Sequence, residues 1–445
     1  MKKNILKKQT IINKKFISNL FDELFFIPRS ITGKGFRKSL NIFKKFINFK
    51  IYKTPSGKKI FDWTVPKEWI INDAYIINPK GKKICNFNEN FLHLVGYSKA
   101  VNTNLNLEEI KKKIFTIPKY QNYIPYVTSY YKKDWGFCMK HNDFKKLKKG
   151  NYKAVVNSSF VKGSVDFGLA KLNGRMKKNF LLSSYLCHPN LANNELSGPL
   201  VMLGLYERIK NWKNRNFNYF FLLNPETIGS ICFIKKFKNN ILNNLQGGLV
   251  LTCLGGKNND LSYKLSRNEN SKLNKLILNL EKYDSGIKTR NFTPATGSDE
   301  RQFCSPGLNS PIGQIARDPD GTFKEYHSSA DTKSYMNVDK ILNSIDKIEN
   351  LLKLNDYNCD IYSQNPYSEP QLGKRNLYDK LNNQVLPRSA NKKPTHSLRY
   401  YLTNILSLSD GQHTLVDIAN KLEVSSNLIF KYIKLLIEEK LIIIK

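Results

Sequence analysis

Residues 179–198, NFLLSSYLCHPNLANNELSG, place an imidazole directly after an apolar run. The run at 179–186 has the length and composition of a strand buried on both faces, and His188-Pro189 stands where that strand would end. In an α/β sheet, ligands bind in loops beyond the carboxyl ends of the strands. His188 is therefore a candidate ligand-binding residue, with a hydrogen-bonded turn histidine as the alternative.

The sequence around this run alternates between strands and helices. Because strands that alternate with helices are buried on both faces, the pattern predicts an α/β fold: a mostly parallel mixed sheet sandwiched by helices. Residues 1–50 together with 151–355 are expected to form this core. The predicted core strands are 153–159, 179–186, 218–224 and 247–254, and the predicted helices include 199–212, 271–283 and 338–354.

Local composition and residue pattern predict two further domains. Residues 51–150 contain short apolar runs separated by Gly, Pro and Asn, which is typical of an inserted, mainly β domain. Residues 356–396 are rich in Pro, Asn and Ser and are expected to be a linker. Residues 397–445 show three helical patterns and a final apolar strand, which favour a winged-helix domain.

The composition restricts the classes of function. The formal net charge is +36, but the lysines are spread over the whole chain and accompany abundant Asn, Ile, Phe and Tyr, which share A/T-rich codons. We therefore attribute the charge to composition and do not expect a nucleic-acid partner. The seven cysteines are scattered singly, which argues against disulfides and a structural zinc knuckle. Without a long apolar segment or a secretion signal, a cytoplasmic protein without a membrane span is expected.

Three polar groups follow predicted core elements and indicate a metal site. His188 follows the first strand, Glu226 follows the strand 218–224, and His327 lies in the later segment EYHSSAD. Zn²⁺ binds imidazole and carboxylate ligands, and its catalytic sites usually combine three protein ligands with a water. A carboxylate beside the metal can instead act as the general base. A helix-capping role for Glu226 is the structural alternative.

Several sequence motifs are similar to those of known hydrolases. The segment from TGSDERQF to EYHSSADT resembles the closing signature of co-catalytic zinc aminopeptidases. Further blocks along nearly the full length resemble one bacterial family of aminopeptidase-like proteins, which carries a β-rich insertion and a C-terminal winged helix and is associated with polysaccharide biosynthesis. These blocks include PRSITGKG, VPKEWIINDAYI, IPYVTSYYKKDWGFC, CHPNLANNELSG, PETIGS, GSDERQFCSPG and SDGQHTLVDIA.

The resemblance implies that His188 and His327 bind metal and that Glu226 is the catalytic base or a further ligand. Asp299 is a candidate for binding a substrate amine, with a structural capping role as the alternative. Arg301 is a candidate for binding a substrate carboxylate, with a salt bridge to a neighbouring acid as the alternative. Asp331 is expected to orient His327 through its other ring nitrogen.

Two departures from the family pattern affect the metal count. Asn194 stands where the family has the aspartate that bridges two metals, and Gly256 stands where an acid is expected after the strand 247–254. A neutral amide is a poor bridging ligand, and Glu195, one residue along, is expected to point elsewhere. One zinc ion is therefore favoured over two.

The predicted function is a zinc-dependent, aminopeptidase-like hydrolase that acts on a peptide or amide bond of a small substrate, or a catalytically impaired descendant of one. The alternative is a non-catalytic binding protein on the same fold, with the winged helix as an interaction module.

Overall fold

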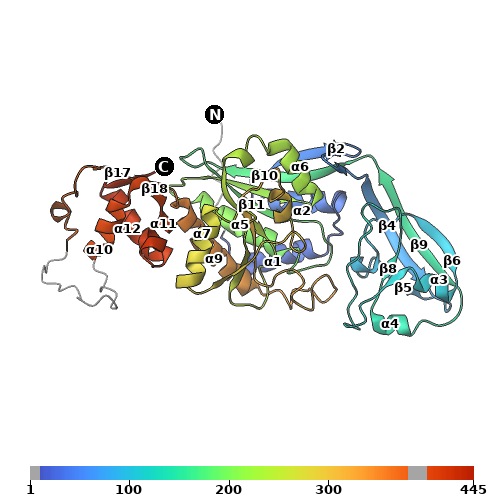
Figure 1. Cartoon of the computed structure of the whole chain (residues 1–445). Helices are drawn as coiled ribbons and strands as arrows, with labels where there is room; N and C mark the ends of the chain where they lie inside the picture. The colour runs from blue at the N-terminus through green and yellow to red at the C-terminus, as the bar shows by residue number, and fades with distance from the viewer. Residues whose placement is uncertain (1–10, 379–397) are drawn as a thin grey trace, which may run out of the picture.

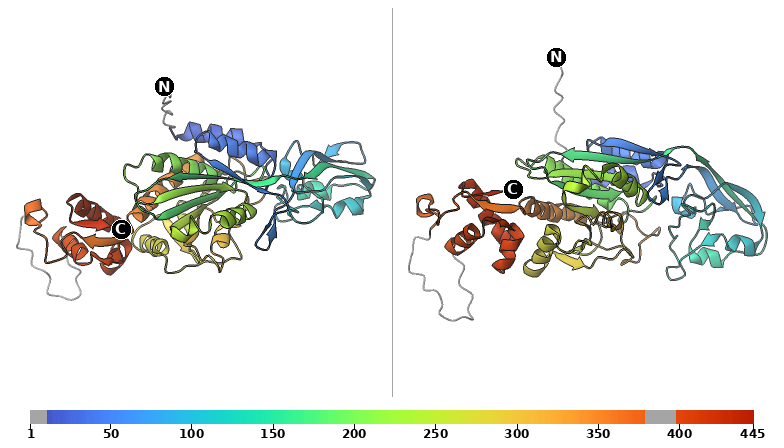
Figure 2. Two further views of the ribbon diagram at one scale, coloured as in Figure 1. Left: turned by 90° about the horizontal axis from the view of Figure 1, so that it is seen from above. Right: turned by 45° about the horizontal axis from the view of Figure 1, so that its top comes forward.

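The structure, a computed structural model, describes residues 11–378 and 398–445. Figure 1 shows three bodies in a row: the α/β core in the middle, the β-rich insertion at one end and the C-terminal body at the other, and both views in Figure 2 agree. Among the described residues, no helix combines the length and apolar character that crossing a membrane requires.

The core is built on one mixed eight-stranded sheet in the order β1-β10-β12-β11-β13-β16-β14-β15. Strands β12, β11, β13 and β16 run parallel at its centre. The predicted α/β class is thus confirmed. The strands are β1 (Lys50–Pro55), β10 (Ser164–Leu172), β11 (Asn179–Tyr185), β12 (Asn218–Asn224), β13 (Leu245–Leu251), β14 (Leu261–Lys264), β15 (Ile287–Arg290) and β16 (Ile312–Ala316).

Helices cover both faces of this sheet, which explains why its central strands are continuously apolar. Every residue of β11 is buried. Phe180 and Leu182 point into the core formed with α1, α2, α5 and α9, whereas Leu181 points into the core formed with α6 and α8. These helices are α1 (Lys14–Phe25), α2 (Lys34–Lys44), α5 (Ser197–Lys210), α6 (Ile228–Phe237), α8 (Glu300–Phe303) and α9 (Val338–Asp356).

The insertion between β1 and β10 has its own four-stranded sheet, in the order β5-β4-β9-β6. Residues 153–159, predicted to form a core strand, instead lie in β9, which pairs with β4. Their alternating burial is that of a strand with one covered face. Conversely, β1 pairs with β10 of the core. The insertion includes β4 (Glu68–Ile77), β5 (Lys83–Ile84), β6 (Val101–Leu105), β7 (Ile114–Phe115), β8 (Phe137–Cys138), β9 (Tyr152–Val161), α3 (Leu107–Lys111) and α4 (His141–Lys145).

In its described residues, the C-terminal body contains three α-helices and a three-stranded sheet in the order β18-β17-β19. Its central strand, β17, lies inside the segment 356–396 that was predicted to be a linker, so this body begins before residue 397. Residues 379–397 of that segment lie outside the described residues. The elements are β17 (Asp360–Ser363), α10 (Leu398–Ser407), β18 (Asp410–Thr414), α11 (Leu415–Lys421), α12 (Ser426–Glu438) and β19 (Ile442–Ile444).

The first turn of α12 is bonded to α7 (Lys272–Tyr283) of the core. Asn279 Oδ1 accepts hydrogen bonds from the backbone N–H and the hydroxyl of Ser426, and Asn279 Nδ2 donates to the backbone oxygen of Val424. Asp284 accepts bonds from the side chains of Ser425 and Asn427. The core therefore holds the end of the helix that in winged-helix proteins contacts DNA bases.

Candidate active site

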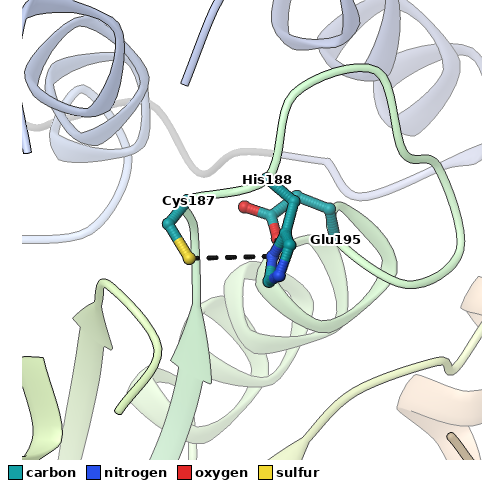
Figure 3. A group of neighbouring side chains, drawn as sticks. All are labelled: Cys187, His188 and Glu195. Atoms are coloured by element: carbon teal, nitrogen blue, oxygen red, sulfur yellow. Dashed lines mark hydrogen bonds and ion pairs between the residues drawn. The ribbon is translucent and has the colours of Figure 1, made fainter. Parts of the chain in front are cut away.

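His188 lies in the loop between β11 and α5, where its side chain is 5% exposed. Its Nδ1 atom is 2.5 Å from Glu195 Oε2 and 3.6 Å from the Cys187 sulfur (Figure 3). Burial raises the pKa of the Cys187 thiol to about 11, so the thiol is neutral at physiological pH. The carboxylate is thus the charged partner of Nδ1, and it favours a proton on that nitrogen.

A buried arginine from the N-terminal segment supports this pair. Arg29 Nε donates to the backbone oxygen of His188 over 3.0 Å and lies 3.7 Å from Glu195 Oε1. The side chains of Arg29 and Glu195 are both fully buried. Because Nδ1 of His188 is engaged on this side, its Nε2 faces the other way, 3.6 Å from Glu226 Oε2.

Glu226 is held by a strained turn after β12. Thr227 has φ 64° and ψ −74°, which is the rare γ-turn conformation, and the N–H of Ile228 bonds to the Glu226 oxygen across it. Such a backbone is unusual for a β-branched residue. Ser298 donates from its hydroxyl to Glu226 Oε1 over 2.7 Å. Burial raises the pKa of Glu226 to about 7, in the range of a general base at neutral pH.

Asp299 stabilises this turn. One carboxylate oxygen accepts the N–H of Thr227 over 2.6 Å, and the other accepts the side-chain amide of Asn224 over 3.0 Å. Asp299 is completely buried, and burial raises its pKa. These contacts correspond to the capping role that was the structural alternative for Asp299. Its binding to a substrate amine stays a prediction.

His327 lies in the loop before α9, and its backbone is left-handed, with φ 51°. Its ring centroid lies 5.6 Å from that of His188 and 3.9 Å from that of Tyr326, on which it stacks. Burial and the neighbouring His188 lower the pKa of His327 to about 3, so its imidazole is neutral and able to bind a cation.

The charge state of His188 differs from that of His327. Burial lowers the pKa of His188, but the acidic groups around the ring outweigh burial and raise it well above the ordinary value. Burial also raises the pKa of the Tyr126 phenol and of the Cys187 thiol, so both are neutral and the charged group beside the ring is the Glu195 carboxylate. A cation at Nε2 must therefore displace a proton, which makes binding weaker at low pH.

His188 and Glu226 approach each other closely enough to contact one cation. Two ligand atoms at about 2.1 Å from one zinc ion are at most about 4.2 Å apart, and His188 Nε2 and Glu226 Oε2 satisfy this limit. In residues 11–378 and 398–445, only Cys187, His188 and Glu195 bring three ligand atoms within 4.8 Å of one another. At least one of these side chains must therefore move for His188, Glu226 and His327 to share an ion.

The two departures from the family pattern have distinct structural settings. Asn194 donates its amide to the Tyr185 hydroxyl over 3.1 Å, and its buried oxygen has no hydrogen-bond partner in the described structure. Position 194 thus offers a neutral oxygen and no charge for a second ion. A Cβ at Gly256 would lie 1.8 Å from Asp318 Oδ2, so the backbone at 256 has no room for an acidic side chain.

Asp331 and Arg301 are the remaining predicted site residues. Both oxygens of Asp331 accept backbone N–H bonds, from Asn193 over 2.7 Å and from Asn194 over 2.9 Å. Asp331 therefore holds the loop after His188, and its predicted action on His327 stays a prediction. Arg301 Nε is buried without a hydrogen-bond partner in the described structure. Its predicted role in binding a carboxylate stays open.

Four residues near the site were not identified from the sequence as site residues: Arg29, Tyr126, Glu195 and Asp320. Arg29 and Tyr126 belong to the blocks PRSITGKG and IPYVTSYYKKDWGFC, which were noted for their resemblance without a role. Glu195 was expected to point away from the site. Asp320 accepts a hydrogen bond from the Gln314 side chain over 2.6 Å and contributes to the raised pKa of Glu226.

Relatives of this chain are found among aminopeptidase-like proteins. A Clostridium acetobutylicum protein, provisionally named for polysaccharide biosynthesis and an aminopeptidase-like domain, is 39% identical over 406 residues, which is 91% of each chain. A crystal structure of a protein from the same organism, provisionally described as a peptidase, has a TM-score of 0.85 at 36% identity and covers 97% of this chain and 96% of its own.

More distant structures share the fold alone. The zinc aminopeptidase of Bacillus subtilis has a TM-score of 0.54 at 12% identity, over 76% of this chain and 93% of its own. A peptidase M28 precursor from Shewanella amazonensis has a TM-score of 0.52 at 12% identity, over 76% of this chain and 95% of its own. The aminopeptidase-like fold predicted from the motifs is thus confirmed.

Two family models match the chain in succession. A winged helix-turn-helix model matches residues 360–443, which confirms the predicted C-terminal module. The model described as Domain of unknown function (DUF4910) matches residues 18–358. The chain therefore belongs to the DUF4910 family, and its DUF4910 domain, which has the aminopeptidase-like fold, is followed by a winged helix.

Proposed function

We propose that the protein is a zinc-dependent hydrolase of a peptide or amide bond in a small substrate. In this proposal His188 and His327 hold one zinc ion, and Glu226 is the general base. The observation that carries it is the 3.6 Å approach of Glu226 Oε2 to His188 Nε2 in a buried site, beside the neutral ring of His327.

The residues divide the chemistry between them. A zinc ion in this position would polarise the scissile carbonyl and acidify a water molecule. Ser298 holds one oxygen of Glu226 over 2.7 Å and leaves the other free to accept a proton from the attacking water. Because the pKa of Glu226 is raised to about 7, the carboxyl can return that proton to the leaving amine.

The substrate class is proposed from Arg301 and from the name of a relative. Arg301, whose Nε lacks a partner in the described structure, is a candidate to bind a carboxylate of the substrate. The Clostridium acetobutylicum relative is named for polysaccharide biosynthesis, and we therefore include amide-linked sugars as candidate substrates besides peptides.

Elemental analysis and a hydrolysis screen test the proposal. Purified protein is expected to contain about one zinc per chain and to cleave a member of a panel of aminoacyl p-nitroanilides and N-acylated amino sugars. The Glu226→Gln variant should keep the zinc and lose hydrolysis, whereas His188→Ala should lose both. His413→Ala, in the winged helix, serves as the control. A zinc-free wild-type protein would contradict the proposal, and two firmly bound zinc ions would contradict the single site.

A non-catalytic binding protein is the second candidate. It is favoured by Asn194, which supplies no charge where the family has an aspartate. Under this alternative the site binds zinc, but no substrate of the panel is cleaved and Glu226→Gln changes nothing. The bonds between α12 and α7 disfavour DNA reading by the winged helix. Saturable, sequence-specific binding of duplex DNA would contradict that conclusion.

A further inference from the structure

The insertion is bonded to the loop that carries His327. The backbone N–H of Tyr126 donates to the His327 oxygen over 2.8 Å, and the N–H of Ser329 donates to the Ile124 oxygen over 2.9 Å. Between these two bonds, Pro125 and Ser328 form an antiparallel bridge. Residues 124–126 therefore hold the backbone at and directly after His327, a residue with a left-handed conformation, across about 200 positions in sequence.

The insertion is also bonded to the loop that carries His188. The N–H of Phe91 donates to the side-chain oxygen of Asn190 over 2.9 Å. A cavity of about 20 Å³ between Arg29, Tyr126 and Pro189 has room for about one water molecule. The two bodies are thus closely packed here, and both histidine loops are attached to the same inserted domain.

One side chain of the insertion contacts both imidazoles. The ring centroid of Tyr126 lies 4.8 Å from that of His188 and 5.3 Å from that of His327, and both contacts are edge-to-face. Its hydroxyl is 2.7 Å from that of Tyr130. His188 has Glu195 to orient its ring. Within the described chain, however, the ring of His327 has aromatic neighbours and no hydrogen bond to its nitrogens.

We propose that the inserted domain helps to position the metal-binding histidines, and that Tyr126 is a positioning residue for the two imidazoles. By filling the space beside both rings, Tyr126 restricts rotation of His327, and the backbone pairing at 124–126 keeps its loop in place. This inference rests on the proposed function for its metal readout, but the ordering of the His327 loop can be tested in metal-free protein.

The test compares Tyr126→Ala, Tyr126→Leu and Tyr126→Phe with the wild type and with Tyr131→Ala, a nearby tyrosine that is 54% exposed. Zinc affinity is measured by chelator competition, and the geometry of the site by the visible spectrum of the Co²⁺-loaded protein. Loss of an orienting partner typically weakens metal binding about 10- to 100-fold. We expect Tyr126→Ala and Tyr126→Leu to show at least about tenfold weaker binding and an altered Co²⁺ spectrum. Tyr126→Phe, which keeps the ring, and Tyr131→Ala should both stay near the wild type.

Hydrogen exchange in the metal-free protein provides the second readout. The amides of residues 326–329 are expected to exchange faster in Tyr126→Ala and Tyr126→Leu, while exchange in β11 is unchanged. If the wild type binds no zinc, the proposed function fails, and the exchange result alone decides the inference. Wild-type exchange in both variants would overturn it, as would wild-type zinc affinity. If Tyr126→Ala does not fold, Tyr126→Leu, which retains apolar volume, carries the comparison.

Discussion

The carboxylate of Glu195 lies 2.5 Å from Nδ1 of His188, seven residues away on the same loop. Arg29, from the start of the chain, lies behind Glu195, and both of their side chains are inaccessible to solvent. The Glu195 carboxylate thus orients the ring of the candidate metal ligand His188, and the buried Arg29 guanidinium is the counter-charge of Glu195.

Glu195→Gln is expected to weaken zinc binding about tenfold or more, because an amide polarises the imidazole less than a carboxylate does. Glu195→Ala should in addition destabilise the fold by about 3–5 kcal/mol, because it leaves the Arg29 charge buried without a partner. Chelator competition and urea unfolding measure the two effects, with the exposed Glu89→Gln as control. Wild-type zinc affinity in Glu195→Gln would show that Glu195 does not act on His188.

The pKa of Glu226 predicts how stability depends on pH. Its pKa is about 7 in the folded protein and near 4.5 in the unfolded chain, so between these values the folded state holds the proton more tightly. The free energy of unfolding of metal-free wild type, relative to Glu226→Gln, should therefore fall as pH rises from about 4.5 to 7. Because a quarter of the side chain is exposed, the slope should stay below about 1 kcal/mol per pH unit. A relative stability that is constant or rises with pH would contradict the burial of this carboxyl.

Thr227→Gly should relieve the left-handed turn beside Glu226. The strain at a β-branched residue with φ 64° outweighs the extra freedom that glycine gives the unfolded chain, so stability should rise by up to about 1 kcal/mol. Hydrolysis should nevertheless fall, because the carboxylate is held less firmly. Thr322→Gly, on an exposed loop, should instead destabilise by about 0.4–1 kcal/mol. Equal destabilisation of both variants in urea unfolding would show that the turn stores no strain.

Asn279→Ala should loosen the winged helix from the core. The variant leaves Ser426 without its acceptor at the buried start of α12, at a cost of about 1–3 kcal/mol. Hydrogen exchange in the first turn of α12 should become faster, while exchange in β11 should not change. Asn239→Ala, at an exposed position after α6, serves as the control. Unchanged exchange in α12 would mean that other contacts dominate this interface.

Much of the core was predictable because local pattern and burial agree there. The apolar runs at 179–186, 218–224 and 247–254 correspond to β11, β12 and β13, which are covered on both faces and need no alternation. The segment 153–159 was assigned to the wrong sheet, although its alternation indicates one covered face. The linker prediction failed at β17 because a four-residue strand is recognised by its pairing, and its partners lie about 50 and 80 residues later.

The residue pattern alone thus established the α/β class, the order of the bodies and the polar residues that follow the core strands. Only the tertiary structure decided which side chains contact each other. Glu195 turns toward His188, Asp299 binds the backbone of the Thr227 turn, and Tyr126 contacts two histidines from distant loops. Periodicity records which residues are buried. The direction of a side chain on a loop depends on contacts with segments far along the chain, which no local pattern contains.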